Sequence, residues 1–437
     1  MEQTINRQLL DFLDRSPSCY HAVANLAELL DGAGYTRLQE FQPWQLNRGG
    51  KYYVTRGDSS ILAFRLPQGK AVGFQMAAAH SDSPTFKVRE VAELPSAGGT
   101  IRLSVEPYGG SIFRSWLDRP LSVAGRVAVS VRDRVETRLV NIDRDLLVIP
   151  SVAIHMNRAI NQGVALDPAV DLPPLYAMGE TGSFRAAVAQ AAGVEENQLL
   201  STELVLYPRT KGTVLGAHGE FIASPRLDDL QCAFGCTMGF LAGKETDTVP
   251  LLCVFNNEEV GSGTRQGADS TFLTDVVERI CHALGCDTEQ RMTMAANSFL
   301  VSADNAHSIH PAHPEYADKQ EYPVLNGGIV VKYNAAQKYT TDVESAAVFC
   351  KLCKDAGVPT QRYSNRADLP GGSTLGNIST AHYSVPAVDI GMPQLAMHSC
   401  YETAGAEDTA YLVQAMTSYF SRSITRVEEG GYRLEKI

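Results

Sequence analysis

The sequence has no long hydrophobic run. Across its 437 residues, no stretch approaches the roughly 18 consecutive apolar residues that a membrane-spanning helix needs. The first residues, MEQTINRQLL, are typical of an amphipathic helix, and they lack the basic start and apolar centre of a secretory signal peptide. We therefore expect a cytoplasmic protein without a membrane partner.

Basic residues are in the minority. Lys and Arg together number 38 and Asp and Glu number 49, which gives a formal net charge of −11 at pH 7. This excess of negative charge argues against nucleic acid as a partner, because the phosphate backbone binds to basic surfaces. It also means that an acidic substrate would need a specific cation within its binding site.

Paired cysteines are scarce as well. The nine cysteines are an odd number and are scattered along the chain, so the sequence does not suggest a disulfide framework. Cys350 and Cys353 form a CxxC pair, but no second pair completes a structural zinc site. We interpret these two cysteines as packing residues on a helix, in a protein of a reducing compartment.

Several common catalytic patterns are missing. The sequence contains neither the HExxH pattern of zinc proteases nor the GxSxG pattern of serine hydrolases. The glycine-rich stretch GGSTLG at residues 371–376 does not match the phosphate-binding patterns GxxxxGK[ST] and GxGxxG. We expect its backbone to line a pocket instead.

Three sections of the chain differ in the spacing of their apolar residues, and the length allows two domains. Residues 1–85 carry helical patterns followed by two strand-like runs. Residues 86–213 alternate apolar and polar residues, as in TIRLSVEPYGG and GRVAVSVRD, which indicates β-strands. From residue 214 onward, apolar runs alternate with helical stretches. The sequence thus predicts an α/β domain made of residues 1–85 and 214–437, interrupted by an inserted β-rich domain, residues 86–213.

Side chains that can bind metals follow five of these expected elements. They are His80 after AVGFQMAAA, Asp228 and Asp229 at the start of a helix, Glu258 and Glu259 after PLLCVFNN, Asp304 after SFLVSA, and His398 after VDIGMPQLAM. Each has a simpler explanation alone, since an aspartate before a helix is commonly an N-cap and a glutamate pair in a loop is commonly exposed. Because ligands of open α/β sheets gather where strands end, we expect the five positions to converge.

A two-metal site would explain all five positions. Two histidines and three carboxylates are suitable ligands for a pair of zinc ions, and one carboxylate must bridge them because neighbouring cations repel each other. Asp82 is placed to accept the second ring N–H of His80 and so to fix its tautomer. Consecutive side chains of an extended segment point in opposite directions, so one of the two adjacent glutamates could bind metal while the other acts as a general base on water.

These pieces, in this order, resemble the aspartyl aminopeptidase family of zinc metallopeptidases. The stretches that carry the resemblance are RSPSCYHAV, AAHSDSP, IPSVAIHMNR, SPRLDDL, NNEEVGS, SADNAHSIHP, VVKYN and QLAMHS, which span nearly the whole chain. The resemblance implies a binuclear zinc domain with a mixed β-sheet between helices and an inserted β-rich dimerisation domain. It also implies assembly of dimers into a tetrahedral dodecamer, and removal of N-terminal Asp or Glu from peptides.

The resemblance also implies a role for each matching residue. His80 and Asp304 would hold one zinc ion, Glu259 and His398 would hold the other, and Asp228 would bridge the two. Glu258 would be the general base, and Asp82 would orient His80. His155 would enter the active site of the neighbouring subunit, and Lys332 would meet the acidic side chain of the substrate. Two positions depart from the family pattern. Asp229 stands where many members carry Asn, so it could exchange roles with Asp228. Asn377 stands where we expect Pro, and this change affects a loop.

Two other functions fit the same residues. One is a dizinc amidohydrolase that acts on acylated amino acids, in which Lys332 would hold a substrate carboxylate. The other is a non-catalytic assembly of the same fold, although a site that is not used need not keep Glu258.

Overall fold

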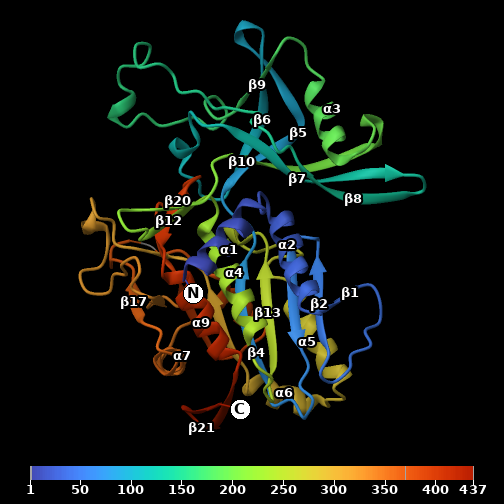
Figure 1. Cartoon of the computed structure of the whole chain (residues 1–437), viewed down its shortest axis with the longest axis vertical. Coiled ribbons are helices and arrows are strands. Elements are labelled where there is room, and N and C mark those ends of the chain that lie inside the picture. Colours follow the sequence, from blue (N-terminus) through green and yellow to red (C-terminus); the bar gives the residue numbers. More distant parts are fainter. Residues whose placement is uncertain (1, 370, 437) are drawn as a thin grey trace.

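The computed structural model describes residues 2–369 and 371–436. An α/β part carries both termini and a β-rich part lies above it in Figure 1. The central sheet of the α/β part has the strand order β1 (Thr36–Leu38), β2 (Lys51–Arg56), β3 (Ser60–Arg65), β13 (Val249–Phe255), β4 (Phe74–His80), β14 (Phe299–Ala303), β18 (Ala387–Gly391), β16 (Ile329–Tyr333) and β17 (Thr360–Ser364). The sheet is mixed: β13, β4, β14 and β18 are parallel neighbours, whereas β3 and β16 run antiparallel to β13 and β18.

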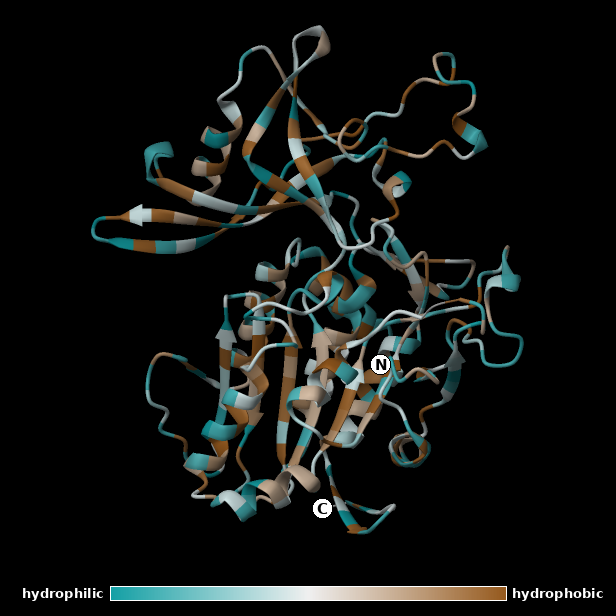
Figure 2. Cartoon of the chain, turned by 180° about the vertical axis from the view of Figure 1, so that it is seen from behind, coloured by the Kyte–Doolittle hydropathy of each residue, from teal (hydrophilic) through white to brown (hydrophobic). Residues whose placement is uncertain are grey.

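Helices cover both faces of this sheet. One face packs against α1 (Glu2–Asp14), α2 (Cys19–Gly32), α4 (Leu227–Ala242), α7 (Val343–Ala356) and α9 (Asp408–Tyr419), and the other against α5 (Phe272–Ala283), α6 (Thr288–Ala296) and α8 (Leu375–His382). Along β4, Ala77 and Ala79 join the first core while Met76 and Ala78 join the second. This strand is therefore mostly apolar because both of its faces are buried, and the central strands in Figure 2 have a largely hydrophobic colour.

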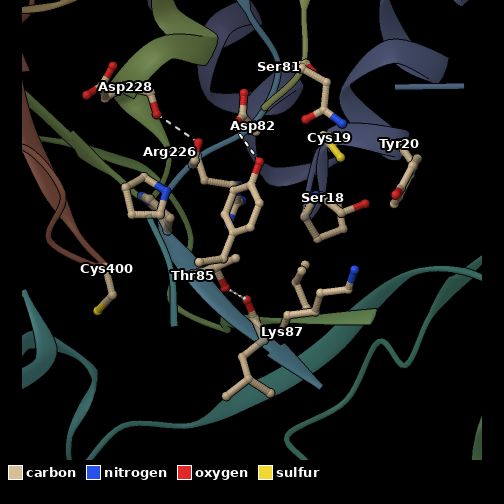
Figure 3. A pocket seen from close by; sticks show the side chains of 18 of the residues that line it. Ser18, Cys19, Tyr20, Ser81, Asp82, Thr85, Lys87, Arg226, Asp228 and Cys400 are labelled. Atoms are coloured by element: carbon tan, nitrogen blue, oxygen red, sulfur yellow. Dashed lines mark hydrogen bonds between the residues drawn. The ribbon is translucent and has the colours of Figure 1, made fainter. Parts of the chain in front are cut away.

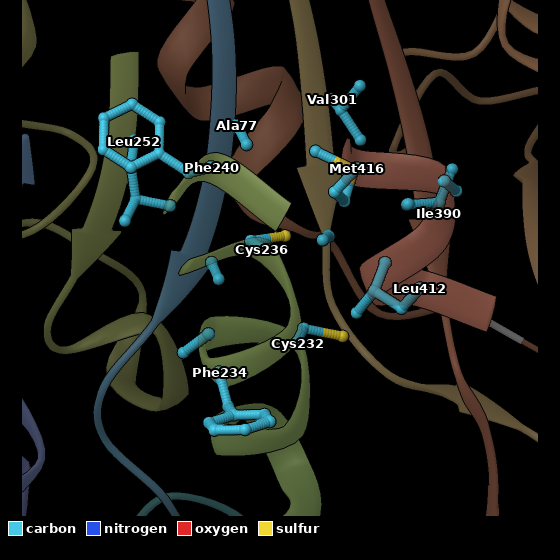
Figure 4. Close-up of a cluster of buried hydrophobic side chains, with 14 of the residues drawn as sticks. Ala77, Cys232, Phe234, Cys236, Phe240, Leu252, Val301, Ile390, Leu412 and Met416 are labelled. Atoms are coloured by element: carbon cyan, nitrogen blue, oxygen red, sulfur yellow. The ribbon is translucent and has the colours of Figure 1, made fainter. Parts of the chain in front are cut away.

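Close packing of α4 against α9 fixes the helix that begins with the two candidate aspartates (Figure 4). Two glycines of α4 make this contact possible. A Cβ atom on Gly235 would meet Leu412 at 2.4 Å, and one on Gly239 would meet Met416 at 2.3 Å. Both distances are shorter than real side chains allow, so glycine is required for this helix spacing.

The β-rich part contains an antiparallel sheet with the order β8 (Arg134–Asn141), β7 (Leu121–Val131), β10 (Leu199–Pro208), β5 (Thr85–Ser96), β6 (Thr100–Tyr108) and β9 (Leu175–Met178), and α3 (Ser183–Ala192) packs on it. Residues 142–174 between β8 and β9 form a long segment that extends to the upper left in Figure 1. The expected α/β fold with a mixed sheet between helices and a β-rich section is thus confirmed. We propose that the inserted domain has its boundaries near the predicted residues 86 and 213.

A smaller sheet connects the two parts. Its order is β11 (Thr213–Leu215), β12 (Phe221–Ser224), β20 (Glu402–Gly405), β19 (Pro393–Leu395) and β15 (Ala306–His307), and the chain closes with the hairpin β21 (Arg422–Glu428) and β22 (Gly431–Lys436). The nine cysteines are free thiols, and Cys353 is buried in α7, as the sequence predicts. None of the helices in the described ranges combines the length and apolar character that crossing a bilayer requires.

Candidate metal centre

The five predicted positions lie at one end of the central sheet. Strands β13, β4 and β14 are parallel neighbours, so their carboxyl ends meet at the same edge. His80 ends β4, Glu258 and Glu259 follow β13 in a short helical turn, and Asp304 follows β14 directly. Asp228 and Asp229 come from the start of α4, and His398 comes from the turn between β19 and β20.

These side chains form three overlapping groups in which the potential ligand atoms lie within 4.8 Å of one another. The groups are His80 with Asp228, Asp229 and Asp304; His80 with Glu258 and Glu259; and Asp228 with Glu259 and His398. The structure therefore brings together all of the residues predicted as ligands, and also Glu258 and Asp229.

Backbone carbonyls fix the tautomers of both histidines. His80 Nδ1 lies 3.1 Å from the carbonyl oxygen of Asp82, and His398 Nδ1 lies 3.1 Å from the carbonyl oxygen of Gly110. Since a carbonyl only accepts, each Nδ1 carries a proton, so in the neutral ring that binds a metal ion each Nε2 keeps its lone pair. Both imidazoles are thus prepared to bind a metal ion through Nε2.

Asp228 lies between the two imidazoles. Its Oδ1 is 3.6 Å from His80 Nε2 and its Oδ2 is 3.4 Å from His398 Nε2, so each oxygen faces one histidine. Asp228 Oδ1 is buried and has no hydrogen-bond partner among the described residues. In the neighbouring Asp229, Oδ1 is likewise buried without a hydrogen-bond partner among the described residues, but Oδ2 accepts the backbone N–H of His80 at 3.0 Å, so only one of its oxygens is open to a cation. A carboxylate with a buried oxygen that lacks a donor fits a cation as its missing partner.

Negative charge dominates the cluster. Seven carboxyl groups lie in it or directly beside it: Asp82, Asp228, Asp229, Glu258, Glu259, Asp304 and Glu402. Burial raises the pKa of Glu258 to about 8 and also raises the pKa of Glu259 and Asp304. Burial alone would raise the pKa of Asp228 too, but its contacts with the two imidazoles lower it. So much buried negative charge is stable only with cations or protons, and a divalent metal suits this donor set.

Asp82 holds the turn that carries the two glutamates. Its Oδ1 accepts the backbone N–H of Glu258 and its Oδ2 accepts that of Glu259, both at 3.2 Å. The hydroxyl of Tyr108 donates to Oδ2 at 2.6 Å. Asp82 Oδ1 is also 3.4 Å from His80 Nδ1, farther than the Asp82 carbonyl oxygen. The His80 Nδ1–H is thus bound by the backbone carbonyl of Asp82 rather than by the carboxylate predicted to orient it, and that carboxylate fixes Glu258 and Glu259 instead.

Glu402 is a residue of the site that the sequence analysis does not find. It is only 1% exposed, and burial raises its pKa to about 8. Its carboxylate accepts the backbone N–H of Asp228 at 3.0 Å and that of His398 at 2.7 Å. It therefore joins two candidate ligands that are far apart in the sequence. An acidic residue in the strand-like stretch YETAG was the available signal, but the contacts are to backbone atoms and leave no pattern.

We expect Glu402→Gln to fold and to bind zinc roughly 10- to 100-fold more weakly than the unchanged chain, because an amide offers one acceptor oxygen to two N–H groups. The measurement is zinc retained against a competing chelator. Glu407→Gln, in the same segment, is the matched control, since Glu407 accepts a bond from Tyr411 and does not contact the cluster. Equal affinities in both variants would contradict the role of Glu402.

Besides Asp82, two predicted residues lie outside the three groups. Lys332 on β16 is only 3% exposed, donates to the carbonyl oxygen of Asn305 at 2.9 Å and has its Nζ 3.8 Å from Asp304 Oδ2. Burial lowers the pKa of Lys332, but Asp304, Tyr339 and Asp389 together outweigh this effect and raise it. His155 is exposed in the long segment between β8 and β9. Lys332 thus adjoins the cluster, whereas His155 does not reach it within one chain.

Fold and site together define the class of protein: an α/β hydrolytic enzyme fold with a buried His and carboxylate metal centre at the ends of parallel strands. Comparisons give the family. Residues 12–420 match the family of aminopeptidase I zinc metalloproteases (M18). The probable M18 family aminopeptidase 2 of Clostridium novyi (strain NT) is 40% identical over 423 residues, which are 95% of this chain and 98% of the relative. The relative of the same name from Pseudomonas paraeruginosa is 40% identical over 97% of this chain and 99% of its own.

Solved structures agree. The chain in "Cryo-EM structure of the Ape4 and Nbr1 complex" has a TM-score of 0.93 and 36% identity, and the match covers 96% of this chain and 86% of that one. "Crystal structure of prApe1" gives a TM-score of 0.91 and 29% identity, over 96% and 95% of the two chains. The protein belongs to the M18 family of zinc aminopeptidases, and the expected resemblance is confirmed at this level.

Proposed function

We propose that this M18 zinc aminopeptidase uses a binuclear site to remove N-terminal Asp or Glu from peptides. The observation that carries the proposal is the Asp228 carboxylate, whose two oxygens face two different imidazoles. In this proposal His80 and Asp304 would hold one zinc ion, Glu259 and His398 would hold the other, and Asp228 would be shared between them. Zinc supplies Lewis acidity toward a carbonyl group and toward water.

Glu258 is the proposed general base. Its backbone is held by Asp82, which fixes its carboxylate beside the proposed ligands, where a general base must lie. Its carboxylate would accept a proton from the attacking water and pass it to the leaving amine. Asp229 is less suited to bridge, because one of its oxygens is already bound to the backbone of His80.

Lys332 is the proposed partner of the acidic substrate side chain. The cluster is rich in carboxylates, which would repel a second acid, and Lys332 is a buried cation beside Asp304. A charge-assisted hydrogen bond is strong in such a low-dielectric environment. In the alternative amidohydrolase, the same ammonium group would hold the carboxylate of an acylated amino acid.

Hydrolysis rates with Asp-, Glu- and Leu-p-nitroanilide and with N-acetyl amino acids test the activity. We expect the acidic anilides to be cleaved fastest, and the ratio of kcat/KM for Asp over Leu to fall roughly tenfold or more in Lys332→Met, because one charge-assisted bond is lost. Lys338→Met is the control, since Lys338 Nζ donates to the carbonyl oxygen of Gly371. Faster turnover of the acetyl compounds would overturn the peptidase assignment in favour of the amidohydrolase.

We also propose that the chain assembles into dimers through residues 86–213 and further into a tetrahedral dodecamer. A solved structure with a TM-score of 0.83 and 29% identity, "Structure of S. cerevesiae mApe1 dodecamer", supports this proposal. The free thiols favour a cytoplasmic setting. In such an assembly the exposed His155 of one subunit would enter the active site of its neighbour.

Mixed assemblies test this arrangement. We expect His155→Ala and Glu258→Gln each to be nearly inactive as pure proteins, because each lacks one catalytic group. When the two variants are co-assembled, a subunit that keeps Glu258 receives His155 from its neighbour, so part of the activity should return. The measurement is hydrolysis of Asp-p-nitroanilide by the co-expressed mixture. Without any recovery, His155 does not act across a subunit boundary.

A further inference from the structure

The β-rich part reaches the metal centre through one turn. Residues 108–110, which we name the 108–110 turn, begin with the last residue of β6 and lead out of the sheet. Its first residue donates to Asp82 and its last accepts from His398 Nδ1. The backbone N–H of Ile112 then donates to the carbonyl oxygen of His398 at 2.9 Å. A segment of the β-rich sheet therefore contacts both sides of the candidate metal centre.

We propose that the 108–110 turn positions the metal centre, and that Tyr108 is a positioning residue that acts through Asp82. The proposal rests on the proposed roles of Glu258 and Glu259. Asp82 is 3% exposed, and its carboxylate holds the backbone of both glutamates. The Tyr108 hydroxyl gives this carboxylate a further donor at 2.6 Å. A hydrogen bond to an ionised carboxylate is among the stronger kinds, so it fixes the orientation of the group.

The same hydroxyl also contacts the glutamate turn from the other side. Asn257 precedes Glu258, and its Nδ2 donates to the Tyr108 oxygen at 2.8 Å. The hydroxyl therefore lies in a closed ring of hydrogen bonds that runs from Tyr108 to Asp82, along the backbone of the turn, and back through Asn257. Loss of the hydroxyl would remove two hydrogen bonds from this ring, and Glu258 and Glu259 would become more mobile. A general base and a metal ligand must each be held in a fixed position, so both roles would suffer.

Steric fit supports the same role. Gly109 has a φ of +72°, and a Cβ atom there would lie 3.1 Å from the Cβ of Glu259. The turn thus packs directly on a candidate ligand, and a side chain at Gly109 would press on Glu259. The junction also encloses a cavity of about 110 Å³, lined by Tyr108, Asp82 and Trp116 among others, part of which is drawn in Figure 3. A change in the placement of the β-rich sheet would therefore alter the positions of Glu258 and His398.

Tyr108→Phe tests the proposal. We expect kcat for Asp-p-nitroanilide to fall roughly tenfold or more with KM changed less than twofold, and zinc to be lost faster to a chelator. Tyr207→Phe is the matched control, because it removes a hydroxyl from the same sheet that bonds Asn141 and Arg209 and does not contact Asp82. The control should keep kcat and zinc release within twofold. Equal behaviour of the two variants would overturn the proposal.

A double-mutant cycle separates positioning from a general loss of packing. In an Asp82→Asn background, Tyr108→Phe should change zinc release and kcat by less than twofold, since the group through which it acts is already altered. If the effects of the two substitutions on kcat and zinc release were fully additive, the positioning role of Tyr108 through Asp82 would be contradicted. The proposed function is judged separately, by cleavage of the acidic anilides by the unchanged chain. If that cleavage fails while zinc release still depends on Tyr108 but not on Tyr207, the specificity is wrong and the positioning role stands.

Discussion

Glu258→Gln should retain its zinc and lose about three orders of magnitude in kcat. The amide has the same size as the carboxylate, and Asp82 holds the residue through its backbone N–H, so the substitution leaves that anchor intact. An amide cannot accept a proton from water or return one to a leaving amine. General-base removal typically costs 10²- to 10⁴-fold, which sets about 10³-fold as the expected size.

The measurement combines zinc analysis with kcat for Asp-p-nitroanilide on the same preparation. Glu278→Gln is a suitable control because Glu278 lies on α5, far from the strand ends, and pairs with Arg291 on the surface. Near-normal turnover in Glu258→Gln, with zinc present, would refute the assignment of the base. Loss of zinc together with activity would instead place Glu258 among the ligands.

Removal of zinc should abolish activity and lower the melting temperature by roughly 5 °C or more. Metal that binds only the folded chain stabilises it by mass action, and the stabilisation is lost with the metal. We expect about two zinc ions per chain before treatment, and recovery of activity when zinc is returned. A zinc-saturated chelator is the control for effects of the chelator itself. Full activity with less than one zinc per chain would contradict the proposed centre and favour a different chemistry or a non-catalytic role.

The loss of stability in the metal-free chain should grow with pH. The pKa of Glu258 is raised from 4.5 to about 8 in the fold, so the folded chain binds more protons than the unfolded chain between these values. Stability then falls as the pH rises from about 4.5 to 8.

His398 acts in the same direction. Burial lowers its pKa, but Asp228 and Glu259 raise it overall from 6.5 to about 10, so its stabilisation is lost as the pH rises through the folded value. Melting temperatures at pH 5.5 and 8, with and without zinc, measure this difference; an equal zinc effect at both pH values would contradict it.

Strand-end positions are the part of the site that the sequence predicts well. An apolar run such as AVGFQMAAAH is long enough to name a buried strand, and the residue at its end must emerge at the edge of the sheet. Parallel neighbours then place His80, the glutamate pair and Asp304 at the same edge. Lys332, which follows the apolar run GGIVV, is likewise buried. Periodicity in residues 86–213 similarly indicated the β-rich character of that section.

Contacts that support the ligands were not predictable in this way. Glu402 and Asp82 bind backbone N–H groups, and Gly110 contributes a carbonyl oxygen, so nothing in the side-chain types reveals the pairing. Tyr108 ends a strand of the β-rich sheet and Asp82 lies in the loop after β4 of the central sheet, so their contact depends on how the two sheets are placed relative to each other. The position of His155 relative to an active site depends on a second subunit, which periodicity within one chain does not describe.

The wide separation of the clustered residues along the chain has a consequence for biosynthesis. His80 is translated early, but His398 and Glu402 follow only within the last tenth or so of the polypeptide. A nascent chain on the ribosome therefore exposes part of the cluster long before it can complete it, and full metal uptake must wait until translation is nearly finished. A premature stop that removed only the final 40 residues would delete His398 and Glu402 and leave a chain unable to mature, even though most of its central sheet had been made.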